Sequence, residues 1–368
     1  MSEDQSYQYL REYSEKDKIW DTQKRISNNV EKTLYSFQNA VLSAERHDQQ
    51  SISLLNSVFS ETPSREKLKE LGSLALKKGL LMSDCGKNLI FALNTTDDGE
   101  LVHRLFRAEF CKFRYCPVCN WRKSLKLKAL FLARAESIVE NNKNISYLFL
   151  TLTMKNDSVE VIDEMLEKLN SSFRKITQQK FFKSSVKGTV KTIEITRSNK
   201  GEAHPHLHVI LAVSSSYFKP KNYKKTEQWV EIWKKALAVD YTPIVDIRRV
   251  YGKTEKGERS EKLTAVVAEV LKYAVKGTDL RDLKFLIHLT DKTKGKRFIS
   301  ATGIFQGVFK EDFSDDELIQ IENDEQTDKK PDDIRAYSFN TGFRKYIRDF
   351  ILEESEKLRM EQESAFGG

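Results

Sequence analysis

The sequence predicts an α+β protein whose central domain is an antiparallel sheet with helices packed on it. Three observations support this fold class. Runs of strand length alternate with helical patterns between residues 141 and 310, the turn residues Asn199-Lys200-Gly201 separate two adjacent strands, and the N-terminal region is helical and polar. The alternation follows the order β-α-β-β-α-β-α, which is typical of a ferredoxin-like or RRM-like split arrangement.

Residues 1–78 form a helical N-terminal region in this prediction. Its apolar residues recur at helical spacing, so one face should pack on another part of the chain. They include Ile26, Val30, Leu34 and Phe37. Residues 79–140 are predicted as a small cysteine-rich module followed by a basic helix over 121–140. Two β-like runs, Asn88–Leu93 and Leu101–Phe106, lie in that module.

Residues 141–310 hold the most regular pattern and are predicted to form the core domain. A strand over Tyr147–Thr153 opens it, and a hairpin around Lys200 lies at its centre. The other elements follow in chain order: a helix over Val159–Thr177, strands over Thr189–Thr196 and His206–Val213, a helix over Thr226–Leu237, a strand over Ile244–Val250 and a helix over Glu261–Val275.

The C-terminal region, residues 311–368, is expected to begin as an acidic linker and to end in a helix. Residues 311–333 contain 11 acidic residues and two lysines, and Lys329–Asp333 has the composition of a linker. An amphipathic pattern over Phe343–Arg359 predicts the closing helix.

The composition narrows the class of partner. The chain has 368 residues, 39% hydrophobic and 32% charged, with a net charge of +8 and an isoelectric point of about 9.0. No apolar run approaches the roughly 18 residues that span a bilayer, and the polar N-terminus lacks the apolar core of a signal peptide. We therefore expect no membrane partner and a cytoplasmic location. The basic charge favours a polyanion, of which nucleic acid is the commonest.

Three of the six histidines stand within five positions, at His204, His206 and His208. Side chains two residues apart on a strand point to one face, so His206 and His208 present two imidazoles side by side and His204 extends the row. Neutral imidazole is the commonest metal ligand. A solvated strand face would give the same alternation, but histidine is scarce elsewhere and the run Leu207–Leu211 is otherwise apolar.

A third ligand is expected across the hairpin. If the turn centres on Lys200, Glu194 pairs with His206, and directly opposed residues lie about 5 Å apart. Glu202 is nearer in sequence but sits at the turn, where it should face solvent. Two histidines and one carboxylate leave open positions on an ion. Such a site suits Mn²⁺ or Mg²⁺ and can polarise a phosphodiester oxygen.

A tyrosine stands on the last helix predicted for the core domain. Glu269 and Tyr273 are four residues apart and share a helical face, and Lys276 follows three residues later. A tyrosine hydroxyl can attack phosphorus and form a covalent phosphotyrosine, and a nearby lysine or metal would stabilise the developing charge. The alternative is an ordinary core or rim tyrosine, since the chain has 13.

The four cysteines fall in one segment. A reducing cytoplasm disfavours disulfides, and a CxxC knuckle with two further thiols predicts a structural Zn²⁺ site. The cysteines are Cys85, Cys111, Cys116 and Cys119. His103 is an alternative to one ligand, and buried thiols beside a turn are the alternative to a metal. Nearby basic residues would anchor DNA phosphates or form a solvated face. They are Arg114, Arg122, Lys123 and Lys126.

Taken in order, the motifs resemble a known family. The segments Leu148–Thr153, His204–Leu211 and Lys272–Lys276 resemble the three motifs of HUH endonucleases. The cysteine segment Cys111–Arg122 and the N-terminal Lys18–Asp21 are similar to rolling-circle replication initiators of small Gram-positive plasmids. The resemblance runs from about residue 16 to residue 310.

The resemblance implies a mechanism and partners. Tyr273 would attack one strand at the hairpin of a plasmid double-strand origin, becoming joined to the 5′ end, and the free 3′-OH would prime a host DNA polymerase. Glu269 occupies the position of a glutamate that, in some members, activates water for the terminating cleavage. The resemblance also implies recruitment of a superfamily-1 helicase.

Two other classes of function stay open in the sequence. A relaxase or single-strand transposase would share the HUH chemistry, although the cysteine segment favours the replication initiator. A non-catalytic nucleic-acid-binding protein of RRM-like fold is the third possibility. Leu148–Thr153 lacks the aromatic stacking pattern expected of an RNA-binding sheet.

Overall fold

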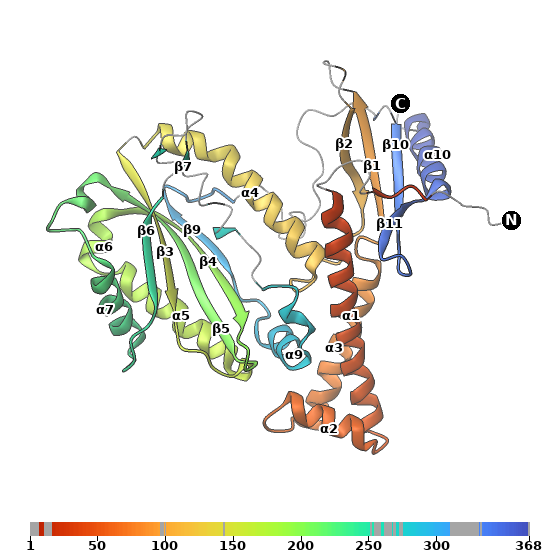
Figure 1. Cartoon of the computed structure of the whole chain (residues 1–368), viewed down its shortest axis with the longest axis horizontal. Helices are drawn as coiled ribbons and strands as arrows, with labels where there is room; N and C mark the ends of the chain where they lie inside the picture. The colour runs from red at the N-terminus through yellow and green to blue at the C-terminus, as the bar shows by residue number, and fades with distance from the viewer. Residues whose placement is uncertain are drawn as a thin grey trace. The chain divides into compact units, whose positions relative to one another are not determined.

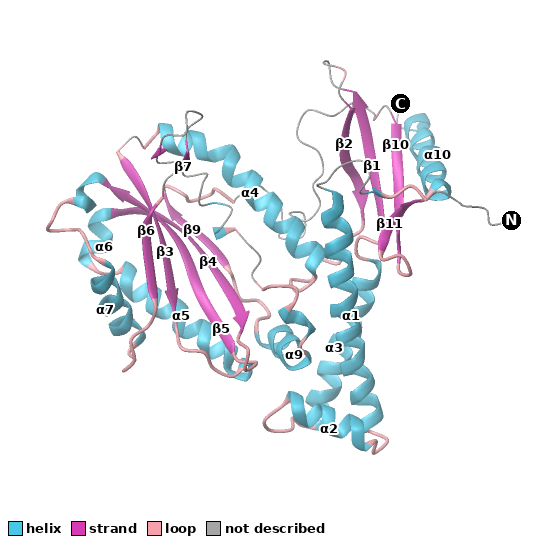
Figure 2. Cartoon of the chain, viewed as in Figure 1, coloured by secondary structure: helices cyan, strands magenta, loops and turns pink. Residues whose placement is uncertain are grey.

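The computed structural model describes residues 7–10, 17–95, 99, 101–142, 144–250, 252–253, 259–260, 267, 270–271, 275–309, 331 and 333–366. These residues divide into two compact units. The first combines Met1–Arg46, Leu68–Arg122 and Ser314–Gly368, and the second combines His47–Lys67 and Lys123–Phe313. Both contain helices and antiparallel sheets (Figures 1 and 2), so the α+β prediction is confirmed. No helix within the described ranges has the length and apolar character needed to cross a bilayer.

The second unit is built on a five-stranded sheet in which every neighbouring pair is antiparallel. Its strand order is β6-β3-β5-β4-β9. The strands are β3 (Ile145–Thr153), β4 (Val186–Arg197), β5 (Ala203–Ser214), β6 (Val245–Arg249) and β9 (Ile299–Gly303). The long β4–β5 hairpin turns at Gly201, whose φ of +85° is readily adopted only by glycine.

Helices cover one face of this sheet. Helix α5 (Ile162–Thr177) and helix α7 (Thr226–Leu237) pack against each other and contact β5 and β6 respectively. Lys191 on β4 donates to Asn170 of α5 at 2.5 Å, which identifies the odd-numbered residues of β4 as the face toward the helix. On β5 the alternation places Leu207 on the helix face and His206 on the other face.

The elements predicted for the core domain occur with shifted ends. The 3₁₀ turn η3 (Val159–Val161) precedes α5, and the predicted strands and the helix over Thr226–Leu237 are all present. The helix predicted over Glu261–Val275 lies mostly outside the described residues. Strand β9 was not predicted, because Ile299–Gly303 is short and its residues are only partly buried or exposed.

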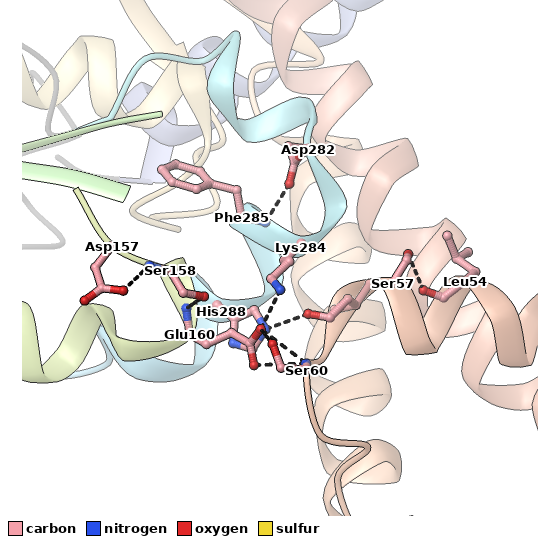
Figure 3. A network of polar contacts seen from close by, with 11 residues as sticks. Leu54, Ser57, Ser60, Asp157, Ser158, Glu160, Asp282, Lys284, Phe285 and His288 are labelled. Carbon is pink, nitrogen blue, oxygen red and sulfur yellow. Dashed lines mark hydrogen bonds and ion pairs between the residues drawn. The ribbon is translucent and has the colours of Figure 1, made fainter. Parts of the chain in front are cut away.

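The segment between residues 47 and 67 packs within the second unit. Helix α2 (Gln49–Val58) contacts helix α9 (Leu283–Lys292). Figure 3 shows the polar contacts beside it: Glu160 accepts from the backbone N–H and hydroxyl of Ser60 and from Lys284, and His288 Nε2 donates to the Val58 carbonyl at 2.9 Å. These bonds hold the end of α2 against η3 and α9.

Smaller elements complete the second unit. They are helix α6 (Lys180–Ser185), the 3₁₀ turns η4 (Ser215–Phe218) and η5 (Asp279–Arg281), and the short strands β7 (Gly252–Lys253) and β8 (Arg259–Ser260), which pair with each other.

The first unit has a four-stranded sheet of order β11-β10-β1-β2. Its strands are β1 (Asn88–Thr95), β2 (Leu101–Ala108), β10 (Asp333–Asn340) and β11 (Lys345–Arg348), and its helices are α1 (Lys18–Ala44), most of α3 (Arg65–Asp84), the start of α4 (Pro117–Glu140) and α10 (Phe350–Phe366). Helix α1 occupies much of the N-terminal region predicted as helical; Val30, Leu34 and Phe37 are fully buried as their spacing predicts, and Ile26 is partly buried.

Two expectations for the C-terminal region are wrong. Residues 345–348 form strand β11 rather than the start of a helix, so α10 begins only at Phe350. Asp333 does not lie in a linker but starts β10, which pairs with β1 and buries Ile334 and Ala336. Pairing with the distant strand β1 makes this segment a strand, and the charge pattern of the segment does not indicate that pairing. Most of the acidic stretch before Asp333 lies outside the described residues.

Candidate functional site

The histidine face of the second unit carries the predicted metal ligands on adjacent strands. The register places Glu194 of β4 directly opposite His206 of β5, and Thr192 opposite His208. The pairing predicted from a turn centred on Lys200 is therefore confirmed. Because opposed residues in a sheet point to the same side, the carboxylate and both imidazoles project from one face.

The three side chains converge on a small volume. Glu194 Oε2 lies 3.1 Å from His206 Nε2 and 2.9 Å from His208 Nε2. The side chains of both histidines are 12% exposed and that of Glu194 15%. The three side chains are thus mostly buried at the sheet surface, with one nitrogen from each ring and one carboxylate oxygen directed at a common point.

Other groups fix the orientation of the imidazoles. Thr151 on β3 lies opposite His208, and its Oγ1 is 3.2 Å from His208 Nδ1. The Phe149 ring stacks on His208, with centroids 5.5 Å apart and an interplanar angle of 12°. His206 Nδ1 lies 3.3 Å from the His204 carbonyl oxygen, which accepts a hydrogen bond from it. In both rings Nε2 is therefore the nitrogen that faces Glu194 and that is available to an ion.

Sequence reasoning missed Thr151 and Phe149. Both lie in the strand pattern Leu148–Thr153, but nothing in that pattern shows which residue of a neighbouring strand it faces. The alternation of the strand does place Phe149 and Thr151 on one face. That this face meets His208 follows only from the pairing of β3 with β5, which the structure shows.

Electrostatics favour the charged form of the carboxylate. Burial would raise the pKa of Glu194, but hydrogen bonds and charge interactions with His206 and His208 outweigh it and hold that pKa below its usual range. Burial, with a smaller contribution from His206, lowers the pKa of His204. His204 Nδ1 contacts Asn156 Oδ1, and His204 is not part of the convergent group. Two imidazoles, not three, therefore meet the carboxylate.

The predicted catalytic tyrosine, Tyr273, lies outside the described residues, as does Glu269. The described residues near them in sequence are held by β4. Thr192 Oγ1 donates to the Val270 carbonyl at 2.9 Å, and Val275 forms a parallel bridge with Ile195. These two contacts fall on either side of Glu194 along the strand. Lys276 is described and is exposed.

The four cysteines come together in the first unit. The Sγ atom of Cys85 is 3.4 Å from that of Cys119 and 3.6 Å from that of Cys116, and Cys111 Sγ is 3.6 Å from Cys119 Sγ. All four Sγ atoms lie within 4.8 Å of one another, which fits tetrahedral thiolate ligands around one ion. His103, the alternative ligand, is not in this group; its ring stacks on Phe91.

Helix and loop contacts brace the cysteine group. Cys116 and Cys119 flank the first turn of α4, and Cys85 follows the end of α3. The buried ammonium of Lys24 in α1 donates to the carbonyl oxygens of Cys85 at 2.7 Å and Ser83 at 3.1 Å. Lys24 could not be predicted from the sequence, because nothing distinguishes it from the other lysines of a polar helix until the loop at Ser83–Cys85 is placed beside it.

Of the basic residues predicted to contact DNA, Arg122 is buried. It is 7% exposed, and its guanidinium lies 5.2 Å from the ring of Trp20 and 5.8 Å from that of Phe110. Burial lowers the pKa of Arg122 to about 10. Its position is that of a packing residue in an aromatic cluster. Arg114, Lys123 and Lys126 are partly exposed.

Known proteins are similar to most of this chain. The family model described as "Replication protein" matches residues 102–347. Relatives named "Protein rep" come from Bacillus amyloliquefaciens (34% identical, over 74% of this chain and 85% of the relative), Lentilactobacillus hilgardii (34%, 72% and 88%) and Streptococcus pneumoniae serotype 2 (31%, 70% and 75%). No solved structure matches the chain significantly. The chain therefore belongs to the replication protein family and is a plasmid replication initiator, as its motifs predicted.

Proposed function

We propose that this initiator is a metal-dependent HUH endonuclease, which nicks one strand of a plasmid origin through Tyr273 and so starts rolling-circle replication. The main support for this proposal is that Glu194, His206 and His208 converge on one face of the sheet. The residues that flank Tyr273 in sequence add support, because Val270 and Val275 are held by β4 on either side of Glu194.

The strand order supports a ferredoxin-like or RRM-like HUH core. The chain order β3-α5-β4-β5-α7-β6 combined with the sheet order β6-β3-β5-β4 matches the split arrangement expected of that fold. Strand β9 extends the sheet beyond β4. In this arrangement the hairpin that carries the ligands occupies one side of the sheet and β3 with β6 the other.

The ligand atoms fit a divalent cation. Glu194, His206 and His208 would hold Mn²⁺ or Mg²⁺ with positions left open, and the bound ion would polarise an oxygen of the scissile phosphate. Thr151 and the His204 carbonyl keep both Nε2 atoms directed at the ion by engaging the Nδ1 atoms.

The covalent step uses the tyrosine hydroxyl. The phenol oxygen of Tyr273 forms a bond to phosphorus as the bond from phosphorus to the 3′ oxygen breaks. The phenol gives up its proton, and the departing 3′ oxygen takes up a proton to become the 3′-OH primer. The DNA 5′ phosphate stays joined to the protein, which conserves the phosphodiester bond energy. Lys276 stabilises charge on the phosphate, and Glu269 activates water at termination.

The cysteine group would hold a structural Zn²⁺. Cys85, Cys111, Cys116 and Cys119 offer four sulfur ligands and leave no open position, which suits folding rather than catalysis. Arg114, Lys123 and Lys126 would contact phosphates beside it. The partners on this proposal are origin DNA, a superfamily-1 helicase and the host polymerase, and the location is the cytoplasm.

Adduct formation tests the proposal. We would incubate the full chain and Mn²⁺ with labelled single-stranded oligonucleotides that carry a random central segment, and then recover complexes that survive SDS. Wild type should give a covalent adduct and Tyr273→Phe none, since the substitution removes only the attacking oxygen. Tyr223→Phe, an exposed tyrosine of the same unit, is the matched control. An adduct that persists in Tyr273→Phe, or none in wild type with any divalent metal, would refute the proposal.

A further inference from the structure

Two segments of the second unit carry lysines and no acidic residue. Residues 178–187, which include helix α6 and the start of strand β4, contain three lysines, and residues 215–226, which lead from strand β5 into helix α7, contain four. Neither segment contains aspartate or glutamate, although the whole chain has 54 acidic residues against 62 lysines and arginines. We call the seven residues the lysine cluster: Lys180, Lys183, Lys187, Lys219, Lys221, Lys224 and Lys225.

The fold brings the two segments together at one end of the five-stranded sheet. Val186 at the start of β4 pairs with Val213 near the end of β5. The Lys224 ammonium lies 5.7 Å from the centroid of the Phe181 ring, so the loop before α7 contacts α6 directly. The lysines of both segments therefore share the end of the sheet opposite the β4–β5 hairpin, where Figure 1 shows α6 beside α7.

Hydrogen bonds hold the loop that presents four of these lysines. The Lys219 carbonyl accepts from the backbone N–H of Asn222 at 2.9 Å, and Asn222 Nδ2 donates to the Ser216 carbonyl at 2.9 Å. Beneath the loop, Trp229 Nε1 donates to the Tyr217 hydroxyl at 3.2 Å, and both side chains are fully buried. The lysines thus extend from an ordered backbone, and a ligand that binds them does not have to order the loop.

The ammonium groups are open to solvent and are not neutralised. Six of the seven lysines are exposed, and Lys224 is partly exposed. Among the described residues none of the seven forms an ion pair, and Lys187 donates only to the neutral Ser184 carbonyl, at 3.5 Å. The first acids that follow along the chain, Glu227 and Glu231 of α7, are themselves exposed. A group of unpaired like charges attracts a polyanion.

The aromatic rings at this surface favour duplex over single-stranded DNA. Proteins bind single strands on exposed rings against which the bases stack. The Phe181 ring is instead covered by Lys224 and packs edge-on against Trp229, with centroids 5.7 Å apart. Of the aromatic residues in the two segments only Tyr223, at 45%, is exposed. Lysines on flexible stems suit duplex phosphates, which they contact without reading the sequence.

We propose that the lysine cluster binds the phosphates of double-stranded DNA and forms a contact surface separate from the metal ligands. Along β5, the eight residues from His206 to Ser214 span about 27 Å at about 3.4 Å per residue. This length corresponds to about eight base pairs, so one phosphate cannot occupy both sites. The inference rests on the family to which the chain belongs and does not depend on the proposed nicking reaction.

Salt-dependent binding of a fluorescein-labelled duplex to the full chain tests the proposal. Each phosphate contact contributes about 0.9 to the slope of log affinity against log salt. Lys219→Gln/Lys221→Gln should therefore reduce the slope by about 1.8, which corresponds to an affinity loss of about 60-fold at 0.1 M salt if the curves meet at 1 M. Failure of wild type to bind the duplex, or an unchanged slope in this variant, would overturn the proposal.

Lys168→Gln/Lys294→Gln is the matched control. Both lysines are exposed in the second unit but lie outside the cluster, so the variant removes the same charge. Slope and affinity should stay at the wild-type values, and thermal unfolding shows that both variants are folded before binding is compared. An equal loss in the two double variants would mean that duplex DNA responds only to net charge, which would refute a defined surface.

Two comparisons locate the contact. Lys180→Gln/Lys183→Gln removes two charges from α6 and should reduce the slope as the loop variant does; an unchanged slope would contradict a surface shared by both segments. Oligothymidylate in place of the duplex should lose less affinity in either variant, and a larger loss for the single strand would refute duplex binding. If wild type forms no covalent adduct while duplex binding depends on the cluster, the proposed function fails and this inference stands.

Discussion

Replacing Thr151 with valine tests whether the hydroxyl, rather than the strand alone, prepares His208 for a metal ion. The Thr151 Oγ1 lies 3.2 Å from His208 Nδ1 and engages that nitrogen, so that Nε2 is the ring atom that faces Glu194. Valine keeps the β-branched shape that the strand favours. The substitution therefore removes one hydrogen bond and leaves the backbone pairing of β3 with β5 in place.

The size of the effect follows from what remains around the imidazole. Loss of a group that orients a metal ligand typically costs 10–100-fold in metal affinity or activity. Here the Phe149 ring still stacks on His208, and the ladder still fixes the Cα of His208 opposite position 151. We therefore expect the lower end of that range, about a tenfold increase in the Mn²⁺ concentration that gives half-maximal adduct formation.

A Mn²⁺ titration of the adduct-forming rate measures this. At saturating Mn²⁺ Thr151→Val should approach the wild-type rate, because the hydroxyl affects ligand orientation and not the attacking oxygen. Thr151→Ser restores the hydroxyl and should restore the half-activating concentration. Thr153→Val is the matched control, since the Thr153 hydroxyl donates to the Ile244 carbonyl at 2.9 Å. Unchanged Mn²⁺ dependence in Thr151→Val, or an equal shift in Thr153→Val, would refute the reasoning.

Two further predictions concern stability. Cys116→Ser should lose bound zinc, measured by elemental analysis, and should melt at a lower temperature, because structural zinc contributes folding free energy. Ser27→Ala is its control: Ser27 Oγ lies 3.5 Å from Cys116 Sγ but is not a ligand, and unchanged zinc in Cys116→Ser would contradict the site. For Glu160, burial would raise the pKa, but hydrogen bonds from Lys284 and Ser60 lower it to about 2. This pKa is below the unfolded value of about 4.3, so the contribution to stability is present above that value and is lost as pH falls toward 2. Urea unfolding should show that Glu160→Gln is less stable than wild type at neutral pH and that the gap closes at low pH; a gap independent of pH would contradict this.

The metal ligands could be predicted from sequence because a hairpin is a local structure. A turn position fixes which residues of two strands oppose each other, so Glu194 followed from His206 and the position of Lys200. The four cysteines could likewise be predicted to gather at one site, because their residue type and close spacing are typical of metal ligands. Both predictions needed only residue identity and short-range geometry.

Pairings between distant segments could not be predicted in the same way. Strand β10 pairs with β1 across most of the length of the chain, and the acidic residues before it suggested a linker instead. Arg122 shows the same limit for a side chain. Its charge suggested DNA contact, but the rings of Trp20 and Phe110 that enclose it come from other segments. Charge indicates function only where tertiary packing leaves the group at the surface.

The register of the sheet determines which side chains reach the face of the proposed nicking site. Leu207 lies between His206 and His208 and is fully buried on the helix face, so a slip of one residue would place leucine at the metal and bury imidazoles in the core. The cost of burying those polar rings without partners opposes the slip. The apolar face packed under α5 thus fixes the ligand face above it. Across that face Glu194 on β4, His208 on β5 and Thr151 on β3 stand on three successive strands, so the same register that buries Leu207 brings the carboxylate, the imidazole and the hydroxyl beside it to one side of the sheet.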